Sequence, residues 1–474
     1  ACFGAAPTAL FSIEVHTDPT SSPIFEAGFA GHRKGYDLAH TPGVAGGRFL
    51  LHASMSLFFQ NGGGPCYVVS VGSFADAPSA SALLAGIEAL RSEAEPTLLV
   101  VPDAVLLAQT DCIQVQQAML GQCGDLRDRF AILDLHGGAH ARNSPSGDPV
   151  ASFRSAIGDG HLGFGAAYYP WLDTTLAPTS AITWQSFTDP ANLADLLGTD
   201  PGNVPSKQLA DALADLRLTD AQWSDRAIGA IQAQQHGGTP NQRPAHDQVE
   251  HGLALFRHSL DQQLRTLCPL FNTIVGQATR QLNRLPPGAA MAGVYARVDN
   301  ERGVWKAPAN VGVSAVQAPA VAISQNEQDD LNVALDGKSI NAIRSFIGQG
   351  TLVWGARTLD GNSFDWRYVN VRRTMMMIEV SCRLAIQAYA FEPNEALTWV
   401  TIQSMLNSFL TELWKAGALA GPTPREAFAV HVGLGQTMTA ADLQQGLLRV
   451  SVMVAISRPA EFITISLQQR MQAS

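Results

Sequence analysis

The chain has 474 residues, of which 46% are hydrophobic and 15% are charged, a composition that suffices for one or two packed domains and excludes an unfolded chain. Its 31 basic and 41 acidic residues give a net charge of -10 without a long basic run, which argues against nucleic-acid binding as its main task. The most apolar stretches, such as residues 97–101 and 450–456, are shorter than the roughly 18 to 20 residues needed to span a bilayer, so we expect no membrane insertion.

Strand and helix signals alternate through the first third of the chain. We expect strands at residues 66–71, 97–102, 129–134 and 165–170, and helices at residues 80–92, 109–120 and 153–157. The first strand follows a glycine turn at residues 62–64, whereas residues 97–102 are a continuous apolar run of the kind buried on both faces of a parallel sheet. This alternation predicts a three-layer α/β domain.

Residues 174–286 have a different character. The sequence there is long, polar and helical, with a break around residues 236–244 that is rich in Gly and Pro. We interpret this stretch as a helical insertion, after which the α/β pattern resumes at residues 292–296. Further on we expect a helix at residues 341–349, a strand at 351–354 and helices at 372–389 and 396–416.

The C-terminal end of the chain is rich in strand signals. We expect a strand around residues 431–433, a short helical turn after the cap-like Thr439, and strands at residues 448–456 and 462–467. In the first of these last two strands, valines alternate with other residues, which predicts one apolar face and one mixed face. A terminal strand has a bare edge, and pairing that edge with another copy of the chain is one way to satisfy it.

Several phrases of the sequence resemble the tail sheath family of contractile phages, R-type pyocins and extracellular contractile injection systems, and they occur in that family's order. They lie at residues 61–69, 128–134, 167–171, 286–310, 353–358, 366–373, 391–394 and 458–462. The densest is Asp299-Asn-Glu-Arg-Gly-Val-Trp-Lys-Ala-Pro-Ala-Asn310, whose mixture of Gly, Pro, Trp and charge is improbable by chance. Family members usually begin with an extended arm, and we expect this chain to be a piece of a longer precursor that starts after that arm, near Phe3 and Gly4.

The resemblance implies a fold and a division into domains. The fold is α/β, with a three-layer subtilisin-like α/β domain that carries a helical insertion, plus an α+β C-terminal sheath core domain that ends in exchanged β-strands. The boundaries we expect are residues 1–60 for the remnant of an N-terminal region leading into the core, 61–310 for the α/β domain with its insertion at about 174–286, and 311–474 for the C-terminal domain.

The resemblance also implies a function, which is that of a contractile sheath subunit and not of an enzyme. Copies of the chain would polymerise as stacked, hexameric rings around an inner tube, and contraction would drive the tube through a target envelope. The partners implied are further copies of the chain, the inner tube protein, baseplate and terminal cap proteins and sheath paralogues, with no cofactor, no metal and no nucleic acid. Assembly would take place in the bacterial cytoplasm, and the product would be part of a virion or of a released phage-tail-like particle.

Two sets of residues are candidates for contacts between subunits. The first set would form the exchanged strands and contains Leu448, Val450, Val452, Val454, Phe462, Ile463 and Ile465. The second set would supply charges that face another subunit or the tube and contains Glu412, Lys415, Arg425, Glu426, Arg372 and Arg373. Solvated surface charge is the simpler interpretation of the second set.

Two other classes of protein remain as alternatives. A serine hydrolase would use Asp134, His236 and Ser314, which follow one another in subtilisin order, but the serine lacks the Gly-Thr-Ser context of such enzymes and no oxyanion-forming turn is evident. A metal site at Asp134, His136 and His140 is a poor candidate because the glycines between these residues indicate a mobile surface loop. A non-contractile structural tail component is the other alternative.

Overall fold

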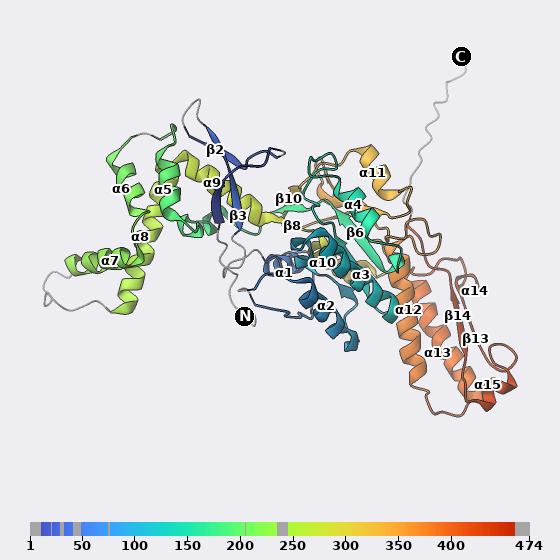
Figure 1. Cartoon of the computed structure of the whole chain (residues 1–474). Helices are drawn as coiled ribbons and strands as arrows, with labels where there is room; N and C mark the ends of the chain where they lie inside the picture. The colour runs from blue at the N-terminus through green and yellow to red at the C-terminus, as the bar shows by residue number, and fades with distance from the viewer. Residues whose placement is uncertain are drawn as a thin grey trace, which may run out of the picture.

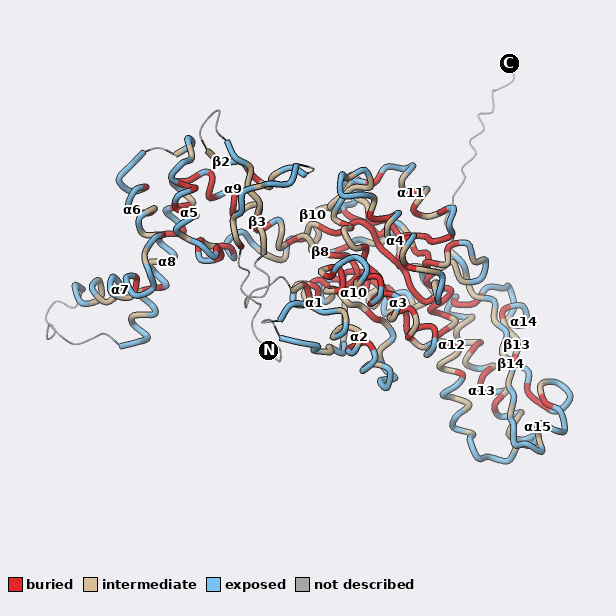
Figure 2. Tube along the Cα trace, viewed as in Figure 1, coloured by how far each residue is buried: buried red, intermediate tan, exposed pale blue. Residues whose placement is uncertain are grey.

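The chain is elongated and is built around three separate apolar clusters, as seen in the computed structural model (Figures 1 and 2). The structure describes residues 11–19, 21–28, 33–40, 49–73, 76–203, 205–234 and 245–459. The largest cluster lies in a central α/β part, a second lies in a helical part at one end, and the third lies in a helix-hairpin part at the other end. Each part therefore has an apolar core of its own.

The central part contains a six-stranded sheet in the order β4-β5-β6-β11-β12-β9. The first four strands run parallel, while β12 and β9 are antiparallel to their neighbours. The strands are β4 (Leu98–Leu99), β5 (Phe130–Asp134), β6 (Gly165–Tyr169), β11 (Ile340–Phe346), β12 (Gly350–Val353) and β9 (Val311–Gly312). The helices of this part are α1 (Leu51–Gln60), α2 (Ala80–Ala89), α3 (Gln109–Leu126), α4 (Pro149–Ala156), α10 (Gly288–Arg302) and α11 (Gln325–Asn332).

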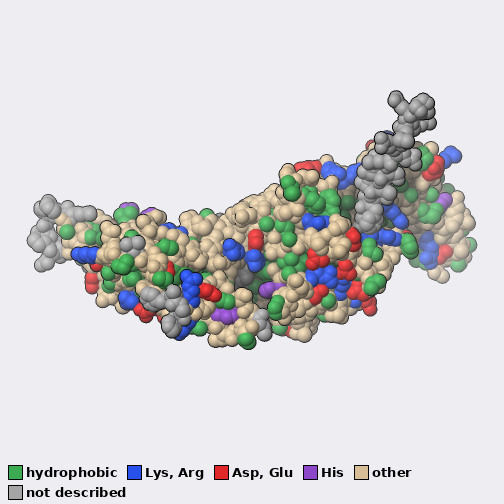
Figure 3. All heavy atoms as spheres, turned by 90° about the horizontal axis from the view of Figure 1, so that it is seen from above, with side chains coloured by type: hydrophobic (Ala, Val, Ile, Leu, Met, Phe, Trp, Pro, Cys, Tyr) green, Lys and Arg blue, Asp and Glu red, His purple; other side chains and the backbone are tan. Residues whose placement is uncertain are grey.

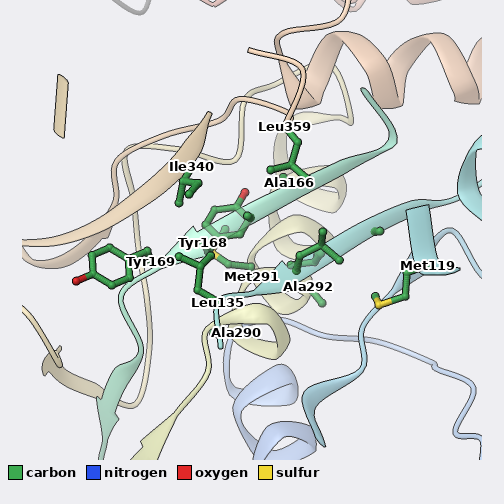
Figure 4. Close-up of a cluster of buried hydrophobic side chains, with 14 of the residues drawn as sticks. Met119, Leu135, Ala166, Tyr168, Tyr169, Ala290, Met291, Ala292, Ile340 and Leu359 are labelled. Atoms are coloured by element: carbon green, nitrogen blue, oxygen red, sulfur yellow. The ribbon is translucent and has the colours of Figure 1, made fainter. Parts of the chain in front are cut away.

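Helices cover both faces of this sheet. On β6, the hydroxyl of Tyr168 lies 2.7 Å from that of Tyr295 on α10, whereas a Cβ built on Gly165 would meet Leu120 of α3. Residues three apart on a strand point to opposite faces, so α3 and α10 lie on opposite sides of the sheet. Every residue of β5 and β6 is buried between these two layers, and Figure 4 shows the side chains that fill this core, from Met119 of α3 to Met291 of α10.

Helix α1 packs closely against α10 at a glycine. A Cβ on Gly293 would lie 2.4 Å from the carbonyl oxygen of Phe58 and 2.8 Å from Cβ of Asn61. No side chain larger than hydrogen fits between the two helices at this point without a shift of the backbone.

The helical part joins the insertion to the N-terminal strands. Its helices are α5 (Pro190–Gly198), α6 (Lys207–Asp215), α7 (Asp220–Gln234), α8 (His246–Leu267) and α9 (Pro269–Asn283). A three-stranded sheet in the order β1-β3-β2 packs on them, with β1 at Phe11–Val15, β2 at Phe25–Ala27 and β3 at Lys34–His40. A small sheet of β7 (Leu172–Thr174), β8 (Arg284–Leu285) and β10 (Val316–Pro319) lies where the chain enters and leaves the insertion.

The third part comprises two long helices and a β-hairpin (Figure 1, orange to red). Its elements are α12 (Val369–Gln387), α13 (Ala396–Lys415), α14 (Pro424–Ala427), β13 (Phe428–Val432), α15 (Ala440–Gln444) and β14 (Val450–Val454). Thr439 caps α15 as the sequence indicates, because its hydroxyl accepts from the amide of Asp442.

Most of the elements expected from the sequence are present, but two expectations are wrong and a third is correct only in part. Residues 341–349 were expected to form a helix, and instead β11 is a strand that pairs with both β6 and β12. The expected strand at 66–71 forms no ladder; Val69 and Val71 pack near Gly86 of α2. The expected strand at 97–102 shortens to β4, which is an edge strand because no described strand pairs with its outer side.

The helices at residues 190–283 fall inside the interval expected for the insertion. The assignment of residues 1–60, 61–310 and 311–474 to domains stays a prediction. In the described ranges no helix is both long enough and apolar enough to cross a membrane.

Candidate functional site

The candidate site is the outer edge of the β13–β14 hairpin together with the face of α12 beside it. The two long helices hold the hairpin through an apolar cluster that includes Ile378 of α12, Leu406 and Leu410 of α13 and Val430 of β13. Leu448, Val450, Val452 and Val454 are half-buried and pack against this cluster. The valines therefore point inward, as the alternation in the sequence indicates.

Hydrogen bonds around the hairpin show which way the backbone of β14 faces. The strands are antiparallel and place Val452 opposite Val430. The carbonyl of Val430 accepts a hydrogen bond at 2.8 Å from Nε2 of Gln403 on α13, so it points away from β14. Just beyond the strand, the amide of Ala455 donates to the carbonyl of Ala427 on the β13 side.

Antiparallel pairs alternate between residues whose backbone groups face each other and residues whose groups face outward. Val452 and Val430 form a pair of the second kind, because the carbonyl of Val430 points away from β14. Val450 and Val454 lie two residues before and after Val452, so their backbone amides and carbonyls also face outward. Within the described residues no strand pairs with the outer edge of β14. The amides and carbonyls of the three valines thus form a row that an added strand could use.

A groove of about 440 Å³ runs beside this edge. Its apolar floor comes from α12, through Met375, Ile378, Cys382 and Ile386, and its other wall is formed by the three valines of β14. The charged side chains of Arg127, Glu379 and Arg383 also line it. An apolar floor beside unpaired backbone groups is what an amphipathic β-strand requires.

The floor of this groove could not be predicted from the sequence. The apolar spacing of residues 372–389 predicts a helix but cannot tell which of its residues face the core and which remain open beside β14. The unusual run of Met375, Met376 and Met377 was the available signal, because methionine side chains adapt to variable partners.

The remaining strand-exchange candidates, Phe462, Ile463 and Ile465, lie outside the described residues. Nothing in the structure tests their role, which stays a prediction.

The four predicted charges at the end of α13 and in α14 are exposed. Lys415 donates to Glu412 at 2.8 Å, and the hydroxyl of Thr423 donates to Glu426 at 3.0 Å. Arg425 is exposed as well. Figure 3 shows basic and acidic side chains intermingled on the face seen from above, so the described residues of that face carry no continuous field of one sign.

Arg372 and Arg373 are buried within the chain. The guanidinium of Arg372 lies 3.6 Å from the ring centre of Phe164 and 4.5 Å from that of Trp366, and burial lowers its pKa to about 10. Arg373 forms a two-fold ion pair with Asp299, with one N–O distance of 2.9 Å. Their proposed contact with another subunit is untested, and the contacts seen here attach α12 to the central part.

The residues of the alternative hydrolase triad have other tasks in the structure. Asp134 is buried and accepts from the amide of Gly288, at the start of α10, at 2.6 Å, and burial raises the pKa of its carboxyl to about 7. The backbone of Ser314 is held by both side-chain groups of Asn61. His236 lies outside the described residues. No cluster of three metal-ligating side chains occurs in the part of the chain that the structure describes.

Comparison with known proteins places these features in a family context. Residues 362–470, which contain the hairpin and α12, match the family model described as the phage tail sheath C-terminal domain. The tail sheath protein of Burkholderia phage BcepMu is 31% identical over 160 residues, and a putative prophage major tail sheath protein of Pseudomonas aeruginosa strain UCBPP-PA14 is 28% identical over 146 residues. These matches cover 33% and 30% of this chain and only 33% and 36% of the relatives, about a third of their length.

Solved structures extend the likeness over nearly the whole chain. A chain in the anti-feeding prophage baseplate has 26% sequence identity and a TM-score of 0.56, with 99% of this chain and 95% of that chain covered. The anti-feeding prophage helical sheath in its contracted state gives the same identity and coverage with a TM-score of 0.54. A sheath complex of an extracellular contractile injection system, also contracted, has 26% identity and a TM-score of 0.54, with 89% of this chain and 82% of that chain covered. Residues 362–470 therefore match the C-terminal domain family of phage tail sheaths, and nearly the whole chain is similar to chains of contractile sheath and baseplate assemblies.

Proposed function

We propose that this chain is a structural subunit of a contractile sheath, which polymerises as stacked rings around an inner tube and contracts to drive that tube through a target envelope. The supporting likenesses are to a helical sheath and to a baseplate of an anti-feeding prophage and to a sheath of an extracellular contractile injection system. The partners are further copies of the chain, an inner tube protein and baseplate and cap proteins. The particle is a virion or a released phage-tail-like machine that is assembled in the bacterial cytoplasm.

The observation that carries the proposal is the open edge of β14 above an apolar groove. Residues 462–467 of another copy, with Phe462, Ile463 and Ile465, are the strand that fills it. Ile463 and Ile465 alternate with Thr464 and Ser466, so one face of such a strand suits the floor of the groove and the other suits solvent. Backbone hydrogen bonds supply the affinity, and the alternating side chains fix the register.

The work of contraction resides in contacts between copies. Each of the three parts has a closed apolar core, so the parts can keep their internal packing while copies change their contacts. The exposed charges Glu412, Lys415, Arg425 and Glu426 are available for the tube or a neighbouring copy. The central sheet, with its parallel strands between two helical layers, is compatible with the subtilisin-like core that the family resemblance implies.

Two variants test strand addition from its two sides. In the first, Val452→Pro removes an amide that faces away from β13, so the hairpin keeps its own ladder while the outer edge loses a donor. In the second, the chain is ended after Pro459, which removes the donor strand and keeps the groove. We expect neither variant to form sheaths alone, as observed by electron microscopy and sedimentation in the presence of the tube protein.

A mixture of the two variants provides the decisive measurement. One variant retains a donor strand and the other retains an acceptor edge, so the mixture forms pairs but no long polymer. Sheaths of normal length from either variant alone would contradict the proposal. Val69→Pro serves as a control, because residue 69 lies in a segment that belongs to no helix and forms no ladder.

A further inference from the structure

Arg372, in the first turn of α12, is a buried cation that has no carboxylate partner among the described residues. It is 6% exposed, and its Nε is enclosed without a hydrogen-bond partner. Its two terminal nitrogens have no described partner either, but they are not enclosed, so a ligand can reach them. By contrast, three other buried arginines, Arg129, Arg154 and Arg373, each lie within 3.1 Å of a carboxylate. Because burial of a charge without a counter-charge is costly, we expect Arg372 to meet one from outside the described residues.

The neighbours of Arg372 do not replace that counter-charge. Its guanidinium lies against the rings of Phe164 and Trp366, which attract a cation but leave its N–H donors without a strong acceptor. Burial lowers the pKa of Arg372 to about 10, and the opposing effect of Glu379 does not offset it. The charge of Arg127 lowers this pKa as well, so the two arginines lie close enough to act on one ligand.

The two arginines lie at one end of the groove beside β14. Arg127 lines the groove, is exposed, and its side chain has no described partner. Arg372 lies three residues before Met375 and seven before Glu379, and both of these line the groove. Residues at this spacing share one face of a helix, so Arg372 continues the groove by one turn.

The length of the groove places the arginines beside the start of an added strand. Its floor on α12 runs from Met375 to Ile386, about 16 Å, which is the length of about five residues of strand. The carbonyl of Ser457, just after β14, accepts from Nδ2 of Asn370 at 3.3 Å, so β14 ends beside the first turn of α12. A strand that runs antiparallel to β14 therefore begins at Arg372.

We propose that Arg372 and Arg127 bind a carboxylate on the strand that fills the groove, at the residue directly before the apolar run of that strand. This site rests on the proposed function, because it needs a strand added to β14. A guanidinium can hold both oxygens of a carboxylate, and such a bond is stronger in a partly enclosed site than in water. The two arginines thus select a strand with an acidic first residue and fix its register along β14.

Two short peptides that bind to the full-length chain, kept dilute enough to be monomeric, test the site. Both alternate valine and threonine over about five residues, the length of the groove floor. One begins with a glutamate before this run, and the other begins with a glutamine. Fluorescence anisotropy at low salt should show about tenfold tighter binding of the glutamate peptide, because a charge-assisted hydrogen bond is stronger than a neutral one. Added salt should reduce the difference.

Substitutions of the two arginines assign this preference to them. Arg372→Met and Arg127→Gln should each lower the preference for glutamate by about threefold or more. The first removes a buried charge that lacks a counter-charge and the second changes an exposed side chain, so both chains should keep the melting temperature of the wild-type chain or exceed it. Arg302→Gln is the matched control, since Arg302 is an exposed arginine at the end of α10 with no described ion pair.

The outcomes separate the carboxylate site from strand addition itself. Equal affinities of the two peptides for the wild-type chain would overturn the site and leave strand addition standing, and a preference that survives both arginine substitutions would also overturn the site. Val452→Pro should weaken both peptides by the same factor, because it removes an amide of the edge and leaves the arginines in place. If neither peptide binds to the wild-type chain, strand addition fails and the carboxylate site fails with it.

Discussion

Replacing the buried carboxylate of Asp134 with an amide should change how the stability of the chain depends on pH. Asp134 is 4% exposed at the end of β5, and its described hydrogen-bond donor is the amide of Gly288 at the start of α10. The positive end of a helix favours a carboxylate, but burial opposes its charge more strongly and raises its pKa from 3.8 to about 7. Asparagine has nearly the same shape, carries no charge and can still accept from Gly288.

The direction of this pH dependence follows from the pKa values of Asp134 in the unfolded and in the folded chain. At Asp134 the folded chain holds the proton more tightly than the unfolded chain, so the contribution of Asp134 to the free energy of unfolding is greatest at low pH and falls as the pH rises from about 4 to about 7. The whole shift corresponds to about 4 kcal/mol, and the two pKa units between pH 5 and pH 7 to about 3 kcal/mol. The stability of Asp134→Asn relative to the wild-type chain should therefore rise by about 3 kcal/mol between pH 5 and pH 8.

Urea unfolding at several pH values, followed by tryptophan fluorescence, measures this difference. Trp171 is a suitable reporter because its indole donates to the carbonyl of Leu135, the residue after Asp134, at 2.9 Å. Asp365→Asn is the control, since the side chain of Asp365 is 77% exposed. Parallel stability curves for Asp134→Asn and the wild-type chain across this pH range would refute the reasoning.

Three further substitutions test the packing of the chain. Gly293→Ala forces α1 and α10 apart, because the new Cβ would lie 2.4 Å from the carbonyl oxygen of Phe58, and should lower the free energy of unfolding by about 1 to 3 kcal/mol in denaturant titrations. Asp299→Asn leaves Arg373 buried without its counter-charge. It should lower the free energy of unfolding by about 3 to 5 kcal/mol, which is measured as a lower melting temperature. Leu410→Ala opens a cavity in the cluster under the hairpin and should cost about 2 to 5 kcal/mol, measured by hydrogen exchange of β13 and β14.

Strands and helices with a clear apolar period could be predicted from the sequence. β5 is a run of five buried residues, and α13 follows its predicted range within a residue because Gly417 stops it with a positive φ. β11 could not be predicted in this way. Its residues include Ala342, Arg344 and Ser345, which suit a helix in isolation, and only pairing with β6 and β12 makes it a strand.

The candidate site could be predicted only in part. The alternation of Val450, Val452 and Val454 indicates a strand with one apolar face, and it correctly places the valines inward. The sequence does not show which backbone amides and carbonyls of β14 face away from β13. The contact that reveals this direction is the hydrogen bond to Val430 from Gln403, which lies on a helix more than twenty residues away in sequence. The place of Asp134 in a subtilisin-like order of residues made it a candidate for an alternative catalytic role. That order carries no information about the start of α10, where Asp134 accepts a hydrogen bond from Gly288.

The asymmetry of the hairpin bears on the kind of assembly that strand addition can build. On the outer edge of β13 the carbonyl of Val430 is bonded to Gln403, whereas no described strand pairs with the outer edge of β14, which is the acceptor edge in the proposed assembly. The proposed donor strand is a different segment of the same copy. A contact between unlike surfaces is heterologous, and it does not close on itself in a dimer as a two-fold contact does. Repetition of such a contact produces rings where the rotation between copies closes and open helices where it does not, which are the two geometries that a sheath of stacked rings combines.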